Sequence, residues 1–330
     1  MDSRLQGLRV LGFFGILKES FKLIFSRKKI FSQFSLAFLI PLTIIFQVKI
    51  VTAVLFSFNM FKNRDDPEDF TVFIIPQYSS LNFNLMDSFR WVIYWIFSEM
   101  AYLVLLLIFS ILSTIPIAHT IGSIYTSRDV NFSRATALIS KLWKRVFITF
   151  LVIFAITFVY DYLLGPVLGL SLRLLLFKKF TVMKLVVGII LAILYIAMFV
   201  YITIIWRLAS VISVMEPDMS GLKAIMKSRK LIKGKMAATV GVFIVILAFS
   251  AGVDTTFMLL VVYGPIIPIR IGVGIVCFIL KLLAILLLYV VQTVIYFVCK
   301  SYHNEEIEEC DVADDDQNAM DVQLVKKLPV

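Results

Sequence analysis

Long apolar stretches alternate with short segments rich in lysine and arginine along most of this chain. Six of these stretches are each long enough to cross the hydrocarbon core of a bilayer, which takes ~20 residues in a helix. They cover residues 31–58, 91–118, 147–164, 185–206, 238–262 and 271–298. Lipid offers no hydrogen-bond partner to backbone N–H and C=O groups, so each stretch must form a helix. The pattern predicts an all-α, polytopic membrane helix bundle with six transmembrane helices.

Composition supports this class of protein and divides the chain. Hydrophobic residues make up 60% of it and charged residues 16%, whereas soluble domains carry about 25% charged residues. We expect an amphipathic N-terminal segment (1–30), a six-span membrane domain (31–303) and an acidic cytosolic tail (304–330). The tail holds 9 acidic and 2 basic residues, a composition that favours disorder.

The distribution of lysine and arginine predicts the orientation, because basic residues close to spans stay on the cytosolic side. Most of them lie in the N-terminal segment and in the connections after the second and fourth spans. Both termini are therefore expected in the cytosol, in a multi-pass protein of the endoplasmic reticulum or another endomembrane, or of the plasma membrane. The third connection, residues 165–184, deviates with four basic residues. It is apolar enough to lie in the membrane interface or to re-enter the membrane.

Three segments on the cytosolic side, residues 10–26, 132–145 and 221–233, place apolar residues on one helical face and basic residues on the other. Helices of this kind lie in the membrane interface, and we expect three of them. Anionic lipid headgroups are the expected counter-charge, and nucleic acid is not an expected partner. Each segment could instead be a solvated extension of the span that follows it. The candidate headgroup contacts are Lys18, Lys22, Arg134, Lys141, Lys144, Lys223, Lys227 and Lys230.

Charged residues inside or near the spans are candidate functional residues, since an intramembrane charge is costly. They are Lys49, Glu99, Asp161, Arg207, Asp254 and Lys281. Similar depths allow Asp254 to pair with Lys281, and Lys49 with Glu99. Each pair can be structural or can belong to a transport route.

Candidate chemistry is otherwise sparse. The sequence has no paired-histidine zinc motif, no nucleophilic serine elbow and no glycine-rich phosphate loop. Cys299, His303 and Cys310 are too few and too widely spaced for a tetrahedral metal site. We therefore expect no catalytic residue, no metal and no cofactor, and no enzymatic activity. Cys299 lies where the last span meets the cytosol, which suits S-palmitoylation, although an unmodified thiol is the preferred interpretation.

Two cytosolic segments carry a resemblance to a known family. Residues 206–210 (WRLAS), 215–217 (MEP), 221–235 (GLKAIMKSRKLIKGK) and 298–303 (VCKSYH) resemble a plant family of uncharacterised multi-pass membrane proteins. The resemblance implies about six spans and no established activity. In architecture the chain is also distantly similar to the membrane domain of some bacterial glycerophosphodiesterases, whose catalytic part is absent here.

These observations predict a non-enzymatic membrane scaffold or lipid-interacting protein whose basic cytosolic face binds anionic lipids. The alternative is a transporter or channel for a small solute or lipid. A route lined by the intramembrane charges would favour transport, whereas a packed bundle would favour the scaffold.

Overall fold

The computed structural model describes residues 8–61, 85–126, 132–160, 182–264 and 267–303. In these ranges the regular structure is helical throughout. Six of the helices are long and apolar enough to cross a membrane, which confirms the predicted fold class. They cover Lys28–Phe56, Ile96–Tyr125, Ala135–Val159, Val186–Met215, Met236–Val262 and Ile267–Tyr302. The acidic tail and the third connection lie outside the described residues.

Most spans are single helices. These are α5 (Leu85–Tyr125), α6 (Phe132–Val159), α8 (Val182–Met215) and α11 (Ile267–Tyr302). The first span joins α3 (Lys28–Phe34), the π-helix η1 (Ser35–Leu39) and α4 (Ile40–Phe61), and the fifth joins α10 (Met236–Phe257) to the π-helix η4 (Met258–Val262). Two shorter helices, α2 (Phe13–Ser26) and α9 (Leu222–Leu231), precede the first and fifth spans.

Proline shapes the first span. Pro41 has no N–H to donate, and its ring collides with the carbonyl one turn earlier. The chain widens into η1 directly before this residue, which lets the helix continue through the proline. Thr43 then donates its hydroxyl to the carbonyl of Leu39 at 2.8 Å. The first span thus contains a π-helix just before Pro41.

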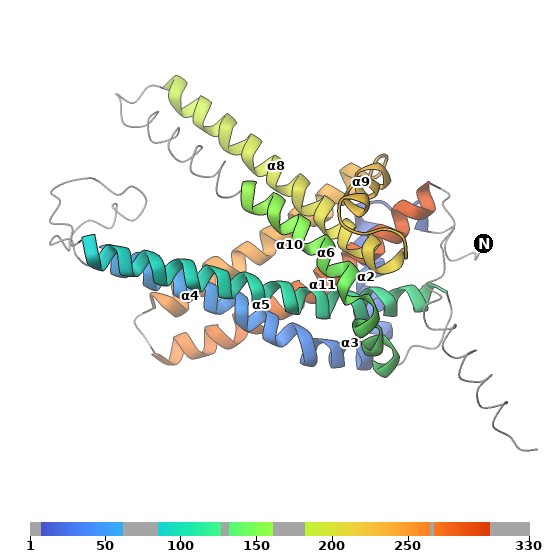
Figure 1. Cartoon of the computed structure of the whole chain (residues 1–330), viewed down its shortest axis with the longest axis horizontal. Coiled ribbons are helices and arrows are strands. Elements are labelled where there is room, and N and C mark those ends of the chain that lie inside the picture. The colour runs from blue at the N-terminus through green and yellow to red at the C-terminus, as the bar shows by residue number, and fades with distance from the viewer. Residues whose placement is uncertain (1–7, 62–84, 127–131, 161–181, 265–266, 304–330) are drawn as a thin grey trace, which may run out of the picture.

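The last span is the centre of the bundle. From Leu288 to Ser301 every residue of α11 is buried, because α2, α4, α5, α8 and α10 all pack against this helix. Figure 1 shows α2, α9 and the end of α11 gathered at one end of the bundle. We call this the basic end, and the other the opposite end. The paired helices α6 and α8 diverge from α4 and α5 toward the opposite end (Figure 1).

Most of the surface away from the basic end is apolar. Large side chains along the first half of α8, among them Ile190, Ile193 and Leu194, are exposed. In a soluble protein such a surface would drive association, but here lipid covers it. The six spans bury few of their own residues for this reason, and the packed core is concentrated around α11.

Of the three expected amphipathic helices, two are separate helices in the structure and one is part of a span. α2 and α9 are separate short helices, but residues 132–145 are continuous with the third span in α6. The second segment is thus an extension of its span, as the alternative interpretation held. The number of interfacial helices stays a prediction.

A tight turn attaches the end of α11 to the segment after α9. Nε2 of His303 lies 3.1 Å from the carbonyl oxygens of both Leu231 and Lys233, to which it donates as a shared N–H. The Tyr302 ring lies against Gly234, which has a φ of 93°. A side chain is disfavoured there both by this left-handed backbone conformation and by the ring.

We therefore expect Gly234→Ala to lower the free energy of unfolding by at least about 1 kcal/mol, measured as a lower melting temperature of the purified protein in detergent. Gly272→Ala is the matched control, because that glycine is helical and has no atom within 4 Å of the added methyl group. A Gly234→Ala protein as stable as Gly272→Ala would contradict this account of the turn.

Candidate functional site

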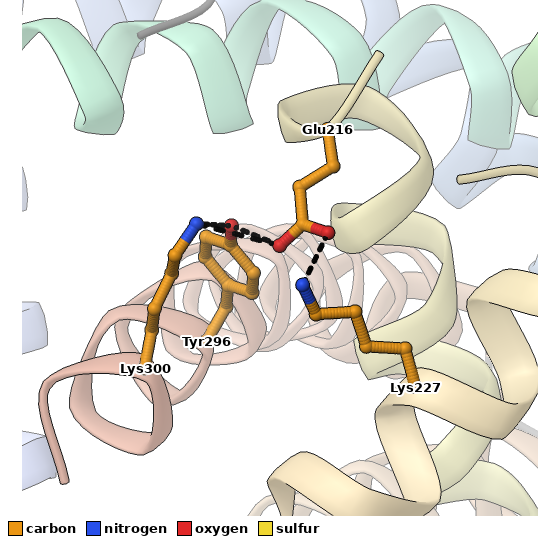
Figure 2. Close-up of polar contacts among 4 residues, drawn as sticks. All are labelled: Glu216, Lys227, Tyr296 and Lys300. Carbon is orange, nitrogen blue, oxygen red and sulfur yellow. Dashed lines mark hydrogen bonds and ion pairs between the residues drawn. The ribbon is translucent and has the colours of Figure 1, made fainter. Parts of the chain in front are cut away.

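A buried cluster of charged residues joins three helices at the basic end. Glu216 follows the last residue of α8, Lys227 lies in α9, and Tyr296 and Lys300 lie one turn apart on α11. Figure 2 shows the Glu216 carboxylate between the two ammonium groups. Its Oε2 lies 2.8 Å from Lys227 Nζ, and its Oε1 accepts a hydrogen bond from the Tyr296 hydroxyl at 3.0 Å. We call these four residues the Glu216 junction.

Burial decides the energetics of the junction. Glu216 and Lys300 are each only 2% exposed, and Lys300 Nζ lies 3.4 Å from Glu216 Oε1 and 3.3 Å from the Tyr296 hydroxyl oxygen. An ammonium group so far from water is tolerated only with an opposite charge and hydrogen bonds. The junction therefore fixes the positions of α8, α9 and α11 relative to one another.

A second set of contacts holds the end of α8 from the side of α6. Carbonyl groups in the last turn of a helix have no partner within the helix. Arg145 of α6 donates to three such oxygens, at 2.9 Å to Ser213, 3.3 Å to Val214 and 2.6 Å to Pro217 just beyond the helix. Thr149, one turn further along α6, hydrogen-bonds the Ser213 hydroxyl at 2.8 Å. The short connection into α9 is thus fastened on both sides.

Both intramembrane ion pairs that the sequence allowed are formed. Lys281 of α11 lies 2.6 Å from the Asp254 carboxylate of α10 and 2.7 Å from the Ser250 hydroxyl. Lys49 of α4 pairs with Glu99 of α5. Each pair joins two neighbouring spans, so the two pairs lie at different helix contacts.

The remaining intramembrane candidates have other surroundings. The Arg207 guanidinium lies 5.4 Å from the Trp206 ring centroid and 5.5 Å from that of Tyr289, positions typical of cation–π contacts. Asp161 lies outside the described residues.

The two ion pairs are close neighbours, because Lys281 Nζ lies 5.2 Å from the Phe46 ring centroid and Lys49 Nζ lies 4.9 Å from that of Tyr102. These two ring centroids are 6.4 Å apart, so four of the described intramembrane charges surround one pair of aromatic rings.

Most candidate headgroup contacts are exposed at the basic end. Lys18 and Lys22 of α2, Lys141 and Lys144 of α6, and Lys223 and Lys230 of α9 are exposed. Lys227 instead points inward to Glu216, which assigns it to the junction rather than to a headgroup. The side chain of Arg134 lies outside the described part.

The other sequence candidates can also be placed. Cys299 is fully buried in α11, an arrangement that leaves no room for an acyl chain on its sulfur. In the described ranges no group of three or more His, Cys, Asp and Glu residues is arranged to hold a metal ion.

Sequence reasoning missed the Glu216 junction. Glu216 stands in the segment that carries the family resemblance, but it was not among the candidate site residues. Lys300 entered only as one of the basic residues that predict the orientation. The i, i+4 spacing of Tyr296 and Lys300 on an apolar helix was the available signal, although the partner that explains it is 80 residues away in the chain.

The family can now be stated. A family model described as Domain of unknown function (DUF8558) matches residues 1–323, and the chain belongs to this family. No curated protein and no solved structure matches it. The chain is thus a multi-pass membrane protein of an uncharacterised family.

Removing the Glu216 carboxylate should destabilise the bundle strongly. Glu216→Gln leaves Lys300 buried without a counter-charge, a change that typically costs about 3–5 kcal/mol. The measurement is the melting temperature in detergent. Glu19→Gln is the matched control, because Glu19 pairs with the exposed Lys22 at 3.7 Å and such surface pairs contribute little. If Glu216→Gln and Glu19→Gln lowered the melting temperature equally, Glu216 would not stabilise the bundle.

A double-mutant cycle should detect coupling between Asp254 and Lys281. Either Asp254→Asn or Lys281→Met alone strands one charge within the membrane and should reduce the yield of folded protein in detergent. The double variant should regain much of this loss, because replacing both members of a buried pair is often tolerated. Strictly additive losses would show that the residues do not interact. Single variants that fold normally but abolish uptake of a solute would assign the pair to transport.

Proposed function

We propose that this protein is a non-enzymatic membrane scaffold whose basic end lies in the cytosol and binds anionic lipid headgroups. Both termini are then cytosolic, in an endomembrane or in the plasma membrane. The resemblances to plant proteins and to the membrane domain of bacterial glycerophosphodiesterases are part of this proposal. The observation that carries it is the outer face of α2.

α2 presents aromatic and basic side chains outward together. Phe14 is 81% exposed and Phe25 61% exposed, and Lys18 and Lys22 are exposed between them. Large aromatic side chains are costly to leave in water, whereas at a membrane interface their rings enter the headgroup region and the lysines meet lipid phosphates. The composition of this face favours a lipid surface over solvent.

The inner face of α2 is fixed to the bundle. Ile16, Ser20 and Leu23 are buried, and the helix packs on α10 and α11. Lys235 Nζ also donates to the Leu11 carbonyl at 3.3 Å, just before α2. Because α2 is held in place on one side, its aromatic and basic side is presented in a constant orientation.

α9 repeats this arrangement on a smaller scale. Leu222 and Met226 are exposed, and Lys223 and Lys230 lie exposed beside them. The inner side of α9 is attached through Lys227 to the Glu216 junction. Two short helices therefore supply apolar and basic groups to the same end of the molecule.

The alternative function, a transporter or channel, has less support. The described intramembrane charges are paired with one another or in contact with aromatic rings, and none of them lines either of the two grooves described below. The packed core around α11 fits a scaffold better.

Removing basic charge from α2 should weaken binding of anionic lipid. We expect Lys18→Gln/Lys22→Gln to bind phosphatidylserine about thirtyfold more weakly, because each lysine near an anionic surface contributes ~1 kcal/mol. The measurement is a titration of the purified full-length protein in detergent with short-chain phosphatidylserine, at low and at high salt. The wild-type affinity should fall toward that of the variant as salt rises.

Lys326→Gln/Lys327→Gln is the matched control, because it removes the same charge from the acidic C-terminal segment. This control should bind as the wild type does. The proposal would be overturned if the α2 variant bound phosphatidylserine as tightly as the wild type and if this affinity did not change with salt.

A further inference from the structure

A groove lies on the opposite end of the bundle from α2, between α4, the η4 end of the fifth span, and α11. Its volume is about 520 Å³. Isoleucine, valine and phenylalanine side chains form most of its wall, and Gly274 of α11 forms part of its floor. A methyl group added at Gly274 would meet only the Val261 side chain, at 3.8 Å. The missing side chain thus opens the groove at this level.

A cation lies at the mouth of this groove. Arg270 is the fourth residue of α11 and lines the groove. Its Nε donates to the Val261 carbonyl at 2.7 Å, one of the acceptors left without a partner where η4 ends. This bond orients the guanidinium group and leaves its two terminal nitrogens for another acceptor. Among the described residues, Arg270 has no carboxylate partner, whereas Lys281 deeper on the same helix is paired with Asp254.

A second polar group lies within the groove. Gln47 of α4 lines it, and in the described part of the chain its amide makes no hydrogen bond. An amide at membrane depth without a partner is unfavourable. The groove therefore offers a guanidinium group, a side-chain amide and an apolar wall, with Gly274 about 6 Å along the helix from Arg270.

We propose that this groove binds one phospholipid of the leaflet at the opposite end of the bundle. The phosphate accepts hydrogen bonds from the terminal nitrogens of Arg270, a glycerol ester carbonyl accepts from the Gln47 amide, and one acyl chain lies over Gly274. Charge complementarity at the mouth selects a phosphate-bearing lipid over a neutral one, because guanidinium–phosphate hydrogen bonds are strong and directional. The site is separate from the α2 face and does not depend on the function proposed for it.

A neighbouring groove supplies a control within the same pair of helices. It lies between α10 and α11, has a volume of about 730 Å³, and is lined by Gly252, Gly272, Thr256, Cys277 and apolar side chains, with no charged residue. An added methyl group at Gly272 would meet no atom within 4 Å. Leucine at Gly272 therefore fills the apolar groove, and leucine at Gly274, two residues away, fills the groove below Arg270.

The experiment is a binding titration of purified full-length protein in detergent with short-chain phosphatidylglycerol, diacylglycerol and glycerol 3-phosphate. The wild type should bind phosphatidylglycerol about tenfold more tightly than diacylglycerol, which lacks the phosphate. It should bind glycerol 3-phosphate, which lacks the acyl chains, far more weakly. Gly274→Leu should lose this binding and Gly272→Leu should keep it.

Arg270→Gln should bind phosphatidylglycerol and diacylglycerol equally, and Arg270→Lys should keep part of the preference because it keeps the charge. The Lys18→Gln/Lys22→Gln background removes the α2 surface from the measurement and should leave the Gly274 effect unchanged. If Arg270→Gln fails to fold, the pair of glycine variants still decides. Equal binding by Gly274→Leu and Gly272→Leu, or a wild type that does not distinguish the two lipids, would overturn the proposal.

Discussion

The Glu216 carboxylate neutralises cations that the bundle could not otherwise bury. Lys300 lies on the stretch of α11 in which every residue is buried, and a lone ammonium group there would be far less stable than one in water. The carboxylate at the end of α8 makes this burial possible, and Lys227 brings α9 to the same point. The packing of the basic end, and with it the presentation of α9, depends on this one acceptor.

The six spans and the possible ion pairs between neighbouring helices could be predicted from the sequence. Hydrophobic length and the cost of bare backbone in lipid leave little choice of structure, and the depths of Asp254 and Lys281 follow from their distance to the turn between their helices. The Glu216 junction could not be predicted from the sequence, because no sequence pattern shows that Glu216 at the end of α8 contacts Lys300, 84 positions later. The same limit explains Lys227, which follows the basic pattern of α9 but points inward.

Residues 132–145 show where pattern reasoning was ambiguous. An amphipathic stretch before a span has the same residue pattern whether or not a turn separates the two. In the structure no turn separates residues 132–145 from the third span. α2 and α9 differ because Arg27 and Gly234 interrupt the helix before their spans, Gly234 with a left-handed backbone. Such local breaks decide whether an amphipathic segment can turn away from the helix that follows it.

The central position of α11 also affects how the protein is made. α11 is the last of the six spans to be synthesised, yet α2, α4, α5, α8 and α10 all pack on it. Until it enters the membrane, Glu216 and Lys227 have each other but neither Tyr296 nor Lys300, and the faces of the other spans that later contact it are open to lipid. Assembly is therefore completed in a late step that converts a loose set of hairpins into a bundle. A chain released before residue 281 would also lack the partner of Asp254, and cellular quality control could distinguish it from the finished protein by this unpaired charge within the membrane.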